Sequence, residues 1–448
     1  MTDKNKTKEL LNAGLKATPA DMVEVGLFSV ERGTTRFANS IIHQNISSEN
    51  PYLWIRVILK SKPGMKIGGL STRNLTTEGV TEAMDRAYEL AEHSNPDKEF
   101  VSLPKKSKAP AKKPKQTKID FVTPEQRASA VKKIVNVCKK HNLSAAGVIT
   151  TSRYSVGVAN NLGINSYFKG GDSYMTVTAM SENSSGFALA CEKKFSKIDF
   201  ADLAEIACEK AIISKNPREI QPGAYTVLLE EPAVAELISY LGWVEFGARA
   251  FAEKRSIMSK KMGKLITGKN ITITDDCNDP RMIAFPFDFE GVDKKKVVMI
   301  DKGIAKGIVT DSFYANKLKM KNTGHAMPQP SAGGPFATAA VMKTGSKTKA
   351  EMLKSIDKGI LITRFWYTRM VDPDKTIFTG LTRDGTFWIE NGKIQYGIKN
   401  LRYTINLYET LKQVAMISKD AILSGEGGQA VVPALLINNF NFSSKTEY

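Results

Sequence analysis

The sequence predicts an α+β fold of two domains: an N-terminal α/β domain with an antiparallel or mixed sheet and helices, and a C-terminal β-rich, barrel-like domain. A chain of 448 residues is too long for one ordinary core. Strand and helix patterns alternate in the first half, whereas short strands and turns dominate the second. The turn-forming stretch Gln221-Pro222-Gly223 separates the halves, so we place the domains at 1–220 and 221–448.

The N-terminal domain is expected to begin with a meander of strands. Apolar residues alternate with Glu24 and Gly26, and residues 52–60 (YLWIRVILK) are rich in β-branched and aromatic side chains. Helices are expected where apolar residues recur at intervals of three and four. The predicted elements are strands within 21–72, a helix over 77–93, a helix that opens at Pro124, strands within 145–192 and a helix over 200–214.

The C-terminal domain is predicted to open with a strand over 225–229, followed by a long helix over 232–255. Most of the remaining chain has the pattern of short strands and turns. One more helix is predicted over 408–423. A single long helix after the first strand is therefore the main helical feature of this domain.

A lysine- and proline-rich tract lies inside the N-terminal domain. The chain has a net charge of +18, and seven of its lysines fall within 104–118 (PKKSKAPAKKPKQTK), which leaves +11 for all other residues. Low apolar content predicts a solvated linker or loop. The alternative is a basic arm that contacts nucleic-acid phosphates. That alternative lacks an aromatic or groove-reading partner nearby, so we favour the linker.

The cysteines and the N-terminus predict a cytoplasmic protein with reduced thiols. Residues 1–6 (MTDKNK) carry no apolar segment typical of a secretory signal, and no apolar run is long enough for a membrane span. The four cysteines form no C-x-x-C pair. We therefore expect buried, free thiols. The cysteines are Cys138, Cys191, Cys208 and Cys277.

No zinc or nucleophile motif is present in the sequence. The four histidines, His43, His93, His141 and His325, are isolated, and H-E-x-x-H does not occur. Zinc sites usually show a paired spacing of ligands. The G-x-S-x-G elbow of hydrolases is also missing. We therefore expect neither a metal ligand set nor a serine nucleophile.

Two glycine-rich segments resemble phosphate-binding loops only in part. Residues 263–270 match G-x-x-x-x-G-K, but Asn270 stands where a hydroxyl should meet Mg²⁺, and a strand rather than a helix is expected next. Residues 425–430 match G-x-G-x-x-A but follow a helical pattern. We interpret the second segment as a helix C-cap and turn.

Acidic residues cluster at Asp275-Asp276 with Asp279, and at Asp288 with Glu290. Alternate residues on a strand share a face, so Asp288 and Glu290 could form an acid/base pair or a cation site. Carboxylates in such positions more often cap turns by accepting backbone N–H bonds. We favour the capping interpretation.

Several segments, taken in order, resemble the TldD/PmbA family, in which PmbA is also called TldE. The resemblance extends over about residues 20–442, and each motif alone is weak. The segments are 35–44 (TRFANSIIHQ), 222–228 (PGAYTVL), 287–292 (FDFEGV), 322–325 (NTGH), 379–385 (TGLTRDG) and 389–394 (IENGKI). The family comprises metallopeptidases and the paralogues that accompany them.

The resemblance implies where a zinc site would lie. Active members carry H-E-x-x-x-H on the helix after the P-G-x-Y strand and a cysteine in a C-terminal C-G-K-x-G-Q stretch. These supply three zinc ligands and a glutamate that polarises water. Here Tyr240 and Glu245 match the two histidines, Leu241 matches the glutamate and Ser424 matches the cysteine. The resemblance thus implies a degenerate site without catalytic residues, metal or cofactor.

The chain therefore resembles the PmbA/TldE side of the family. The resemblance implies a non-catalytic subunit, inactive alone, that pairs with a TldD-type zinc metallopeptidase subunit or with itself. Such complexes cleave unfolded or modified peptides. Peptide or partner contacts are one expectation for 364–369 (RFWYTR), because aromatic and arginine residues are enriched at interfaces; the alternative is a core segment with a solvated rim. The predicted contact residues are Arg364, Trp366, Tyr367 and Arg369.

Two other functions stay open at this point. The chain could be an enzyme with a non-zinc site that uses Asp288, Glu290 or Tyr240. It could also be a DNA-binding or gyrase-modulating protein, which the family's older naming suggests and the net charge of +18 superficially supports.

Overall fold

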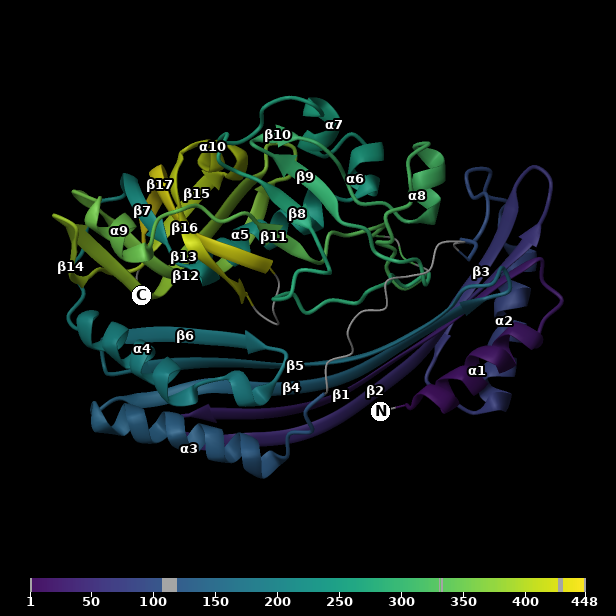
Figure 1. Ribbon diagram of the computed structural model, residues 1–448, viewed down its shortest axis with the longest axis horizontal. Helices are drawn as coiled ribbons and strands as arrows, with labels where there is room; N and C mark the ends of the chain where they lie inside the picture. Colours follow the sequence, from purple (N-terminus) through teal and green to yellow (C-terminus); the bar gives the residue numbers. More distant parts are fainter. Residues whose placement is uncertain (1, 107–118, 330, 332, 426–429, 447–448) are drawn as a thin grey trace.

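The long alternating segments of the first half form one antiparallel sheet with the order β3-β2-β1-β4-β5-β6. In this computed structural model every residue is described except 1, 107–118, 330, 332, 426–429 and 447–448. Figure 1 shows these strands as a long, curved sheet. The strands are β1 (Met22–Ala38), β2 (Ile41–Lys60), β3 (Met65–Thr72), β4 (Ser144–Asn160), β5 (Asn165–Met180) and β6 (Ser185–Glu192).

Four helices pack on one face of this sheet, and the second half of the chain covers the other face (Figure 1). The helices are α1 (Lys4–Lys16), α2 (Thr77–His93), α3 (Pro124–Lys140) and α4 (Phe200–Ile213). Thr76, Thr123 and Asp199 cap α2, α3 and α4 by accepting backbone N–H bonds. The three helices predicted for this region are confirmed, whereas α1 was not predicted.

The second half builds a larger mixed sheet around the order β10-β9-β8-β11-β17-β15-β13-β12-β7, with β14 beside β13 and β16 beside β17. Its core includes the buried face of α5 and strands β7, β12 and β17. The strands are β7 (Gly223–Leu229), β8 (Ile273–Asp275), β9 (Val297–Asp301), β10 (Ile304–Ala305), β11 (Ala340–Met342), β12 (Lys358–Asp372), β13 (Ile377–Glu390), β14 (Lys393–Gly397), β15 (Leu401–Asn406), β16 (Val414–Ser424) and β17 (Ala430–Lys445).

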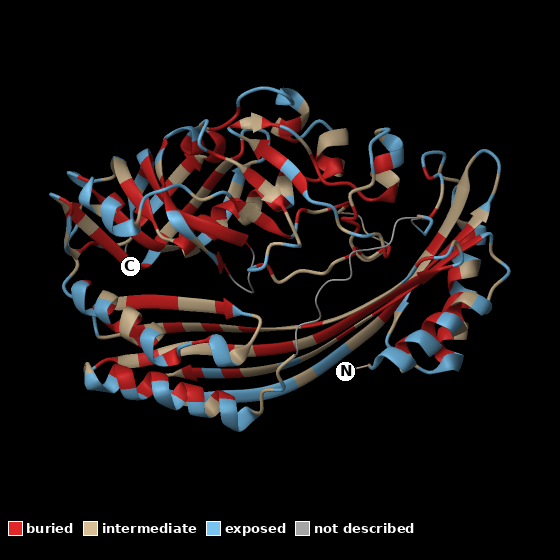
Figure 2. Ribbon diagram, in the orientation of Figure 1, coloured by how far each residue is buried: buried red, intermediate tan, exposed pale blue. Residues whose placement is uncertain are grey.

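The helices of the second half are mostly short. They are α5 (Glu231–Val244), α6 (Ala248–Ala252), α7 (Ile257–Lys261), α8 (Ser312–Lys317), α9 (Lys349–Lys354) and α10 (Leu407–Lys412); a 3-10 turn, η1 (Phe195–Lys197), precedes α4. Figure 2 shows buried residues along the strands and exposed residues on the outer faces of the helices. The α+β fold class is therefore confirmed. The division at residue 220 stays a prediction; the two sheets are formed by residues 22–192 and 223–445.

The single long helix predicted over 232–255 is wrong. α5 ends at Val244, and only the short α6 follows. The backbone between them pairs with Val309 instead of continuing the helix: Val309 N–H donates to Phe246 O at 2.8 Å, and Ala248 N–H donates to Val309 O at 3.0 Å. Gly247 also permits the close approach of residue 335 to this connection, because a Cβ there would lie 2.4 Å from the Pro335 carbonyl oxygen.

The helix predicted over 408–423 is also wrong. Only α10 is helical, and the segment continues as β16, which pairs antiparallel with β17. Strand pairing in a buried sheet overrides the apolar spacing that predicted a helix. Gly425 consequently follows a strand and has a positive φ of 87°, so the helix C-cap interpretation is wrong; residues 426–429 of that segment lie outside the described part.

Within the described residues, no helix is long and apolar enough to cross a membrane. The predicted linker at 104–118 lies largely outside the described residues. The cysteines are free thiols; three are buried and Cys277 is half-buried. The G-K segment at 263–270 is followed by β8 rather than by a helix, in agreement with its rejection as a phosphate loop.

Candidate functional site

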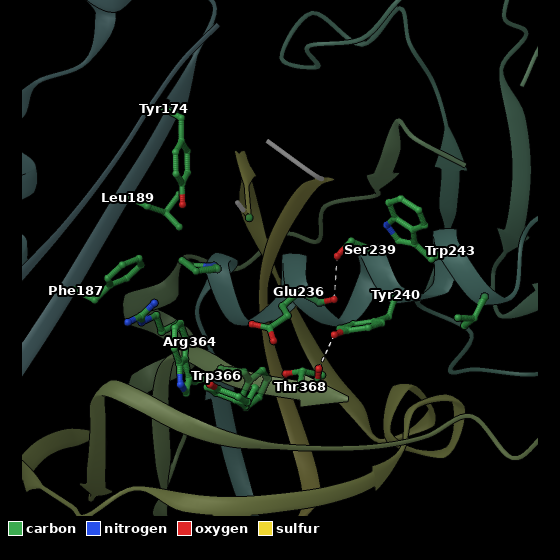
Figure 3. A pocket seen from close by; sticks show the side chains of 15 residues that line it. Tyr174, Phe187, Leu189, Glu236, Ser239, Tyr240, Trp243, Arg364, Trp366 and Thr368 are labelled. Carbon is green, nitrogen blue, oxygen red and sulfur yellow. Dashed lines mark hydrogen bonds between the residues drawn. The ribbon is translucent and has the colours of Figure 1, made fainter. Parts of the chain in front are cut away.

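A cleft of about 690 Å³ lies between the first sheet and the second half of the chain (Figure 3). Side chains from β5 and β6 form one wall, and α5 and β12 form the opposite wall and the floor. The lining residues are Tyr174, Phe187, Leu189, Pro232, Glu236, Ser239, Tyr240, Trp243, Val244, Arg364, Phe365, Trp366, Tyr367, Thr368 and Gly425. Its size is that of an ordinary ligand site.

The helical period of α5 divides its side chains between the cleft and the core. Glu236, Tyr240 and Trp243 recur at i, i+4 and i+7 and line the cleft. Ile238 and Leu241 lie on the opposite stripe and are fully buried in the core. The predicted position Tyr240 therefore faces the cleft, while the neighbouring position Leu241 faces away from it.

A β-bulge in β12 turns two consecutive aromatic side chains outward. The pairing with β13 shifts between Trp366 and Arg369, and Tyr367 has a positive φ of 54°. Successive side chains of a regular strand would point to opposite faces. Here Trp366 is 37% exposed and Tyr367 61% exposed, and their ring centroids lie 5.3 Å apart. The bulge thus supplies the cleft with an aromatic floor.

Arg364 is held in place by an ion pair and by ring contacts. Its guanidinium pairs with Asp384 and lies 4.1 Å from the Phe187 ring centroid and 5.3 Å from that of Trp366. Asp384 also accepts a hydrogen bond from Ser185 Oγ at 2.8 Å. The Arg364–Asp384 pair therefore joins edge strand β6 of the first sheet to β12 and β13 of the second.

Tyr240 is fixed by a hydrogen bond to the bulge. Its Oη donates to the Thr368 carbonyl oxygen at 2.5 Å (Figure 3). Thr368 Oγ1 in turn bonds Tyr403 Oη at 2.6 Å. Burial raises the pKa of Tyr240 above its ordinary value. The phenol is thus protonated near neutral pH and acts as a hydrogen-bond donor that supports the cleft wall.

Glu236 is the single acidic side chain among the described residues that line the cleft. Figure 3 shows its carboxylate directed into the space between Arg364 and Tyr240. Burial raises its pKa, and hydrogen bonds from Thr368 and the charge of Arg364 oppose the rise. Within the described part of the chain no Lys or Arg nitrogen lies in ion-pair range of this carboxylate. The sequence reasoning missed Glu236, although it stands one helical turn before Tyr240.

The other positions matched to zinc ligands have separate surroundings. Glu245 is buried beyond the end of α5, where it accepts hydrogen bonds from Ile257 N at 2.8 Å and Ser256 Oγ at 3.0 Å. Burial raises the pKa of Glu245 to about 6. Ser424 is fully buried at the end of β16, and its Oγ has no hydrogen-bond partner among the described residues. Neither residue lines the cleft with Tyr240.

Metal-ligating residues are not gathered anywhere in the described chain: it contains no group of three or more His, Cys, Asp or Glu side chains placed to hold a metal ion. The acidic run at 275–279 is dispersed among separate partners. Asp275 accepts from His325 Nε2 at 3.0 Å and from Ala339 N at 2.8 Å, whereas Asp279 pairs with Arg281.

Asp288 and Glu290 do not lie on a strand, so the alternative of an acid/base pair on a shared strand face is wrong. Asp288 accepts backbone N–H bonds from Glu290, Val292 and Ala326 at 2.9 to 3.0 Å, which is the capping role. Glu290 accepts from Arg56 Nη2 at 2.8 Å and from Ser312 Oγ at 2.6 Å. Burial, together with the Glu290 charge, raises the pKa of Asp288 well above its ordinary value.

Of the predicted contact residues, Arg364, Trp366 and Tyr367 line the cleft. Arg369 is exposed beside it, with its guanidinium 5.3 Å from the Tyr367 ring centroid. The structure thus brings Tyr240 and three of these four residues to one cavity, and it leaves Leu241, Glu245 and Ser424 outside it.

Two models of one protein family match most of the chain. The PmbA/TldA metallopeptidase C-terminal domain matches residues 222–444, and the central domain of the same family matches residues 108–215. The chain belongs to the PmbA/TldD family. Its resemblance to that family is therefore confirmed, and family membership supports a peptidase-related role.

Other PmbA/TldD proteins align over different lengths. The metalloprotease PmbA homolog of Haemophilus influenzae is 25% identical over 48% of this chain and 45% of its own length, so the chain matches less than half of that relative. The metalloprotease PmbA of Escherichia coli is 22% identical over 79% of this chain and 78% of its own length.

Solved structures share the fold of the whole chain. TldE from Thermococcus kodakarensis superposes with a TM-score of 0.87 at 22% identity, covering 98% of this chain and 100% of that one. A Thermotoga maritima protein superposes with a TM-score of 0.84 at 19% identity, over 98% and 100% of the two chains. These likenesses establish the PmbA/TldD fold.

Proposed function

We propose that this chain is a non-catalytic, PmbA/TldE-like subunit of a TldD-type zinc metallopeptidase complex, which degrades or processes unfolded or modified peptides. One observation carries the proposal. The positions matched to the zinc ligands hold Tyr240, Glu245 and Ser424, and these side chains face three different surroundings. Zinc requires several imidazole, thiolate or carboxylate ligands at one point.

The cleft gives such a subunit a physical task. Its volume of about 690 Å³ and its aromatic walls suit the side chains of a peptide rather than an ion. β6 is an edge strand of the first sheet, and its residues Phe187 and Leu189 line the cleft. An extended peptide can add to an edge strand through backbone hydrogen bonds. The subunit would then orient a peptide for cleavage by its metal-bearing partner.

The test compares the isolated chain with its complex. The chain and a TldD-type subunit encoded in the same genome are purified separately and mixed. Zinc content is measured by elemental analysis, and cleavage of an unfolded peptide is followed by mass spectrometry. We expect no stoichiometric zinc and no turnover in this chain alone, and chelator-sensitive turnover in the mixture. Turnover by the lone chain that survives chelator would instead assign it a site of its own.

A further inference from the structure

Glu236 lies where partial burial disfavours the charged form of its carboxylate unless a ligand supplies a cation. It lies on the cleft face of α5, half-buried, and the described residues around it provide no ion-pair partner. Partial burial disfavours the charged form of a carboxylate, as its raised pKa reflects. A cation supplied from outside the chain would remove that penalty. Hydrogen bonds from Thr368 and the charge of Arg364 offset only part of this burial, so the carboxylate can still accept an ion pair from a ligand.

The neighbours of Glu236 favour an organic cation over a metal ion. One carboxylate provides too few ligands for a metal. The surrounding surface is aromatic, with Trp243 on α5, Trp366 and Tyr367 on the bulge, and Phe187 opposite. Ring faces attract ammonium groups and can replace part of their water shell. An amine that carries a peptide chain fits both the charge and the rings.

The arginines of the region do not make the cleft an anion site. Arg364, the single basic side chain among the described lining residues, is paired with Asp384. Arg383 also lies 3.7 Å from Asp384, and its guanidinium lies 4.6 Å from the Trp366 ring centroid. The Asp384 carboxylate therefore offsets positive charge that would oppose a bound cation. Arg369 lies beyond the lining residues, over Tyr367.

We propose that the cleft binds a protonated amine of the peptide, with the Glu236 carboxylate as its counter-ion and the aromatic side chains of the cleft around it. The amine is a lysine side chain or the amino terminus, since the two share the same ammonium chemistry. This inference rests on the proposed function only in taking the ligand to be a peptide. It adds the property by which the subunit selects peptides.

Three dansyl-labelled nonapeptides of alanine and glycine with amidated C-termini test the proposal. The first has a free amino terminus and a central norleucine. The second is N-acetylated with a central lysine. The third is N-acetylated with a central norleucine and carries no cation. Their dissociation constants for the full chain are measured by fluorescence anisotropy at pH 7.5, at low salt and again in 0.5 M salt.

We expect at least one of the two cationic peptides to bind about tenfold more tightly than the uncharged peptide, with a smaller advantage at high salt. An advantage of the second peptide alone identifies the lysine side chain, and an advantage of the first alone identifies the amino terminus. Glu236→Gln should abolish the advantage and leave the affinity for the uncharged peptide within about twofold.

Two further variants separate binding from folding. Trp366→Leu changes an exposed ring and should reduce the advantage of the cationic peptide several-fold without changing the thermal unfolding midpoint. Phe121→Leu is the matched control, because Phe121 is an exposed ring that stacks with Arg153 outside this cleft. It should leave all three affinities unchanged.

Equal affinity for all three peptides, or an advantage that persists in Glu236→Gln, would overturn the inference. Absence of binding by every peptide would overturn it as well. None of these results decides the proposed function, because that proposal depends on the zinc content and on the turnover of the complex. A chain that binds lysine peptides yet cleaves them alone would retain the inference and refute the non-catalytic role.

Discussion

Two acidic regions lie between the first sheet and the second half of the chain, and they treat their carboxylates in opposite ways. In the first, called here the arginine link, Glu24, Arg56 and Glu290 are buried and bonded together. In the second, the cleft, Glu236 faces open space without an ion-pair partner in the described chain. A glutamate carboxylate is thus ion-paired in the first region and lines a cavity without an ion pair from the described residues in the second.

The arginine link connects two parts of the chain that are far apart in sequence. Arg56 Nη2 donates to Glu24 Oε2 at 2.9 Å and to Glu290 Oε1 at 2.8 Å. Glu24 and Arg56 lie on neighbouring strands of the first sheet, whereas Glu290 belongs to the second half. Such a paired group is structural, because burial of these charges without a partner would be strongly unfavourable; Glu24 Oε1 and Arg56 Nε have no hydrogen-bond partner among the described residues. Arg56 and Glu290 also line a cavity of about 210 Å³, so the difference between the regions is the ion pair, which Glu236 lacks among the described residues.

Removal of the arginine should give the largest effect. Arg56→Met leaves Glu24 and Glu290 buried without their cation, and we expect the free energy of unfolding to fall by about 3–5 kcal/mol. Urea denaturation followed by circular dichroism measures it. The double variant Arg56→Met with Glu24→Gln should recover part of the loss. A loss below about 1 kcal/mol for Arg56→Met would mean that the link contributes little.

The second largest effect should be a pH dependence of the free energy of unfolding that comes from Glu24 in the arginine link. Burial raises the pKa of Glu24 from 4.5 to about 7, so between these values the folded chain binds more protons than the unfolded chain. Stability from this group is therefore present below pH 4.5 and lost as pH rises toward 7, a loss of about 3 kcal/mol. Urea denaturation at several pH values checks this. Glu24→Gln should flatten that part of the profile, and an unchanged slope would contradict the assignment.

Neutralising the cleft carboxylate should have a smaller effect, of opposite sign. Glu236→Gln removes a charge that burial disfavours, so we expect the free energy of unfolding to stay the same or to rise by up to about 1 kcal/mol. Glu290→Gln, the matched change in the link, should instead destabilise the chain. Both are measured in urea at pH 7.5. A large loss for Glu236→Gln would indicate a structural carboxylate and remove the contrast.

The smallest effect is expected at the bulge. Tyr367 has a positive φ, which is unfavourable by about 1 kcal/mol for a residue with a Cβ but not for glycine. Tyr367→Gly should therefore change stability by less than about 1 kcal/mol, because the backbone gain offsets the lost ring contacts. Thermal unfolding measures this. A strong destabilisation would show that the ring supports the fold rather than only the cleft.

Local patterns predicted the elements whose stability is local. α2, α3 and α4 combine an apolar stripe with a capping Thr or Asp, and all three lie where the sequence predicts them. The errors occur where the backbone bonds to a segment that is distant in sequence. Val309 pairs with the backbone at the end of α5 and interrupts the helix predicted over 232–255, and residues 414–424 pair with β17 as a strand. Neither partner can be identified from the local sequence.

In the candidate site, too, the sequence predicted single residues but not the contacts between distant segments. Tyr240 was identified through its place in a family motif, and Arg364, Trp366 and Tyr367 through their chemistry. Their meeting in one cleft depends on the packing of α5 against β12, which the sequence does not express. Glu236 could have been noted from its i, i+4 relation to Tyr240. No sequence pattern would have distinguished it from an ordinary surface glutamate.

The bonds of Asp384 have a mechanical consequence. This one carboxylate accepts from Ser185 on the first sheet and from Arg364 on the second, so hydrogen bonds hold the opposing walls together at that end. We expect breathing of the cavity to take place toward its opposite end, near the exposed indole of Trp243. If the proposed peptide binds here, it would then enter near Trp243 and end at the bonded corner.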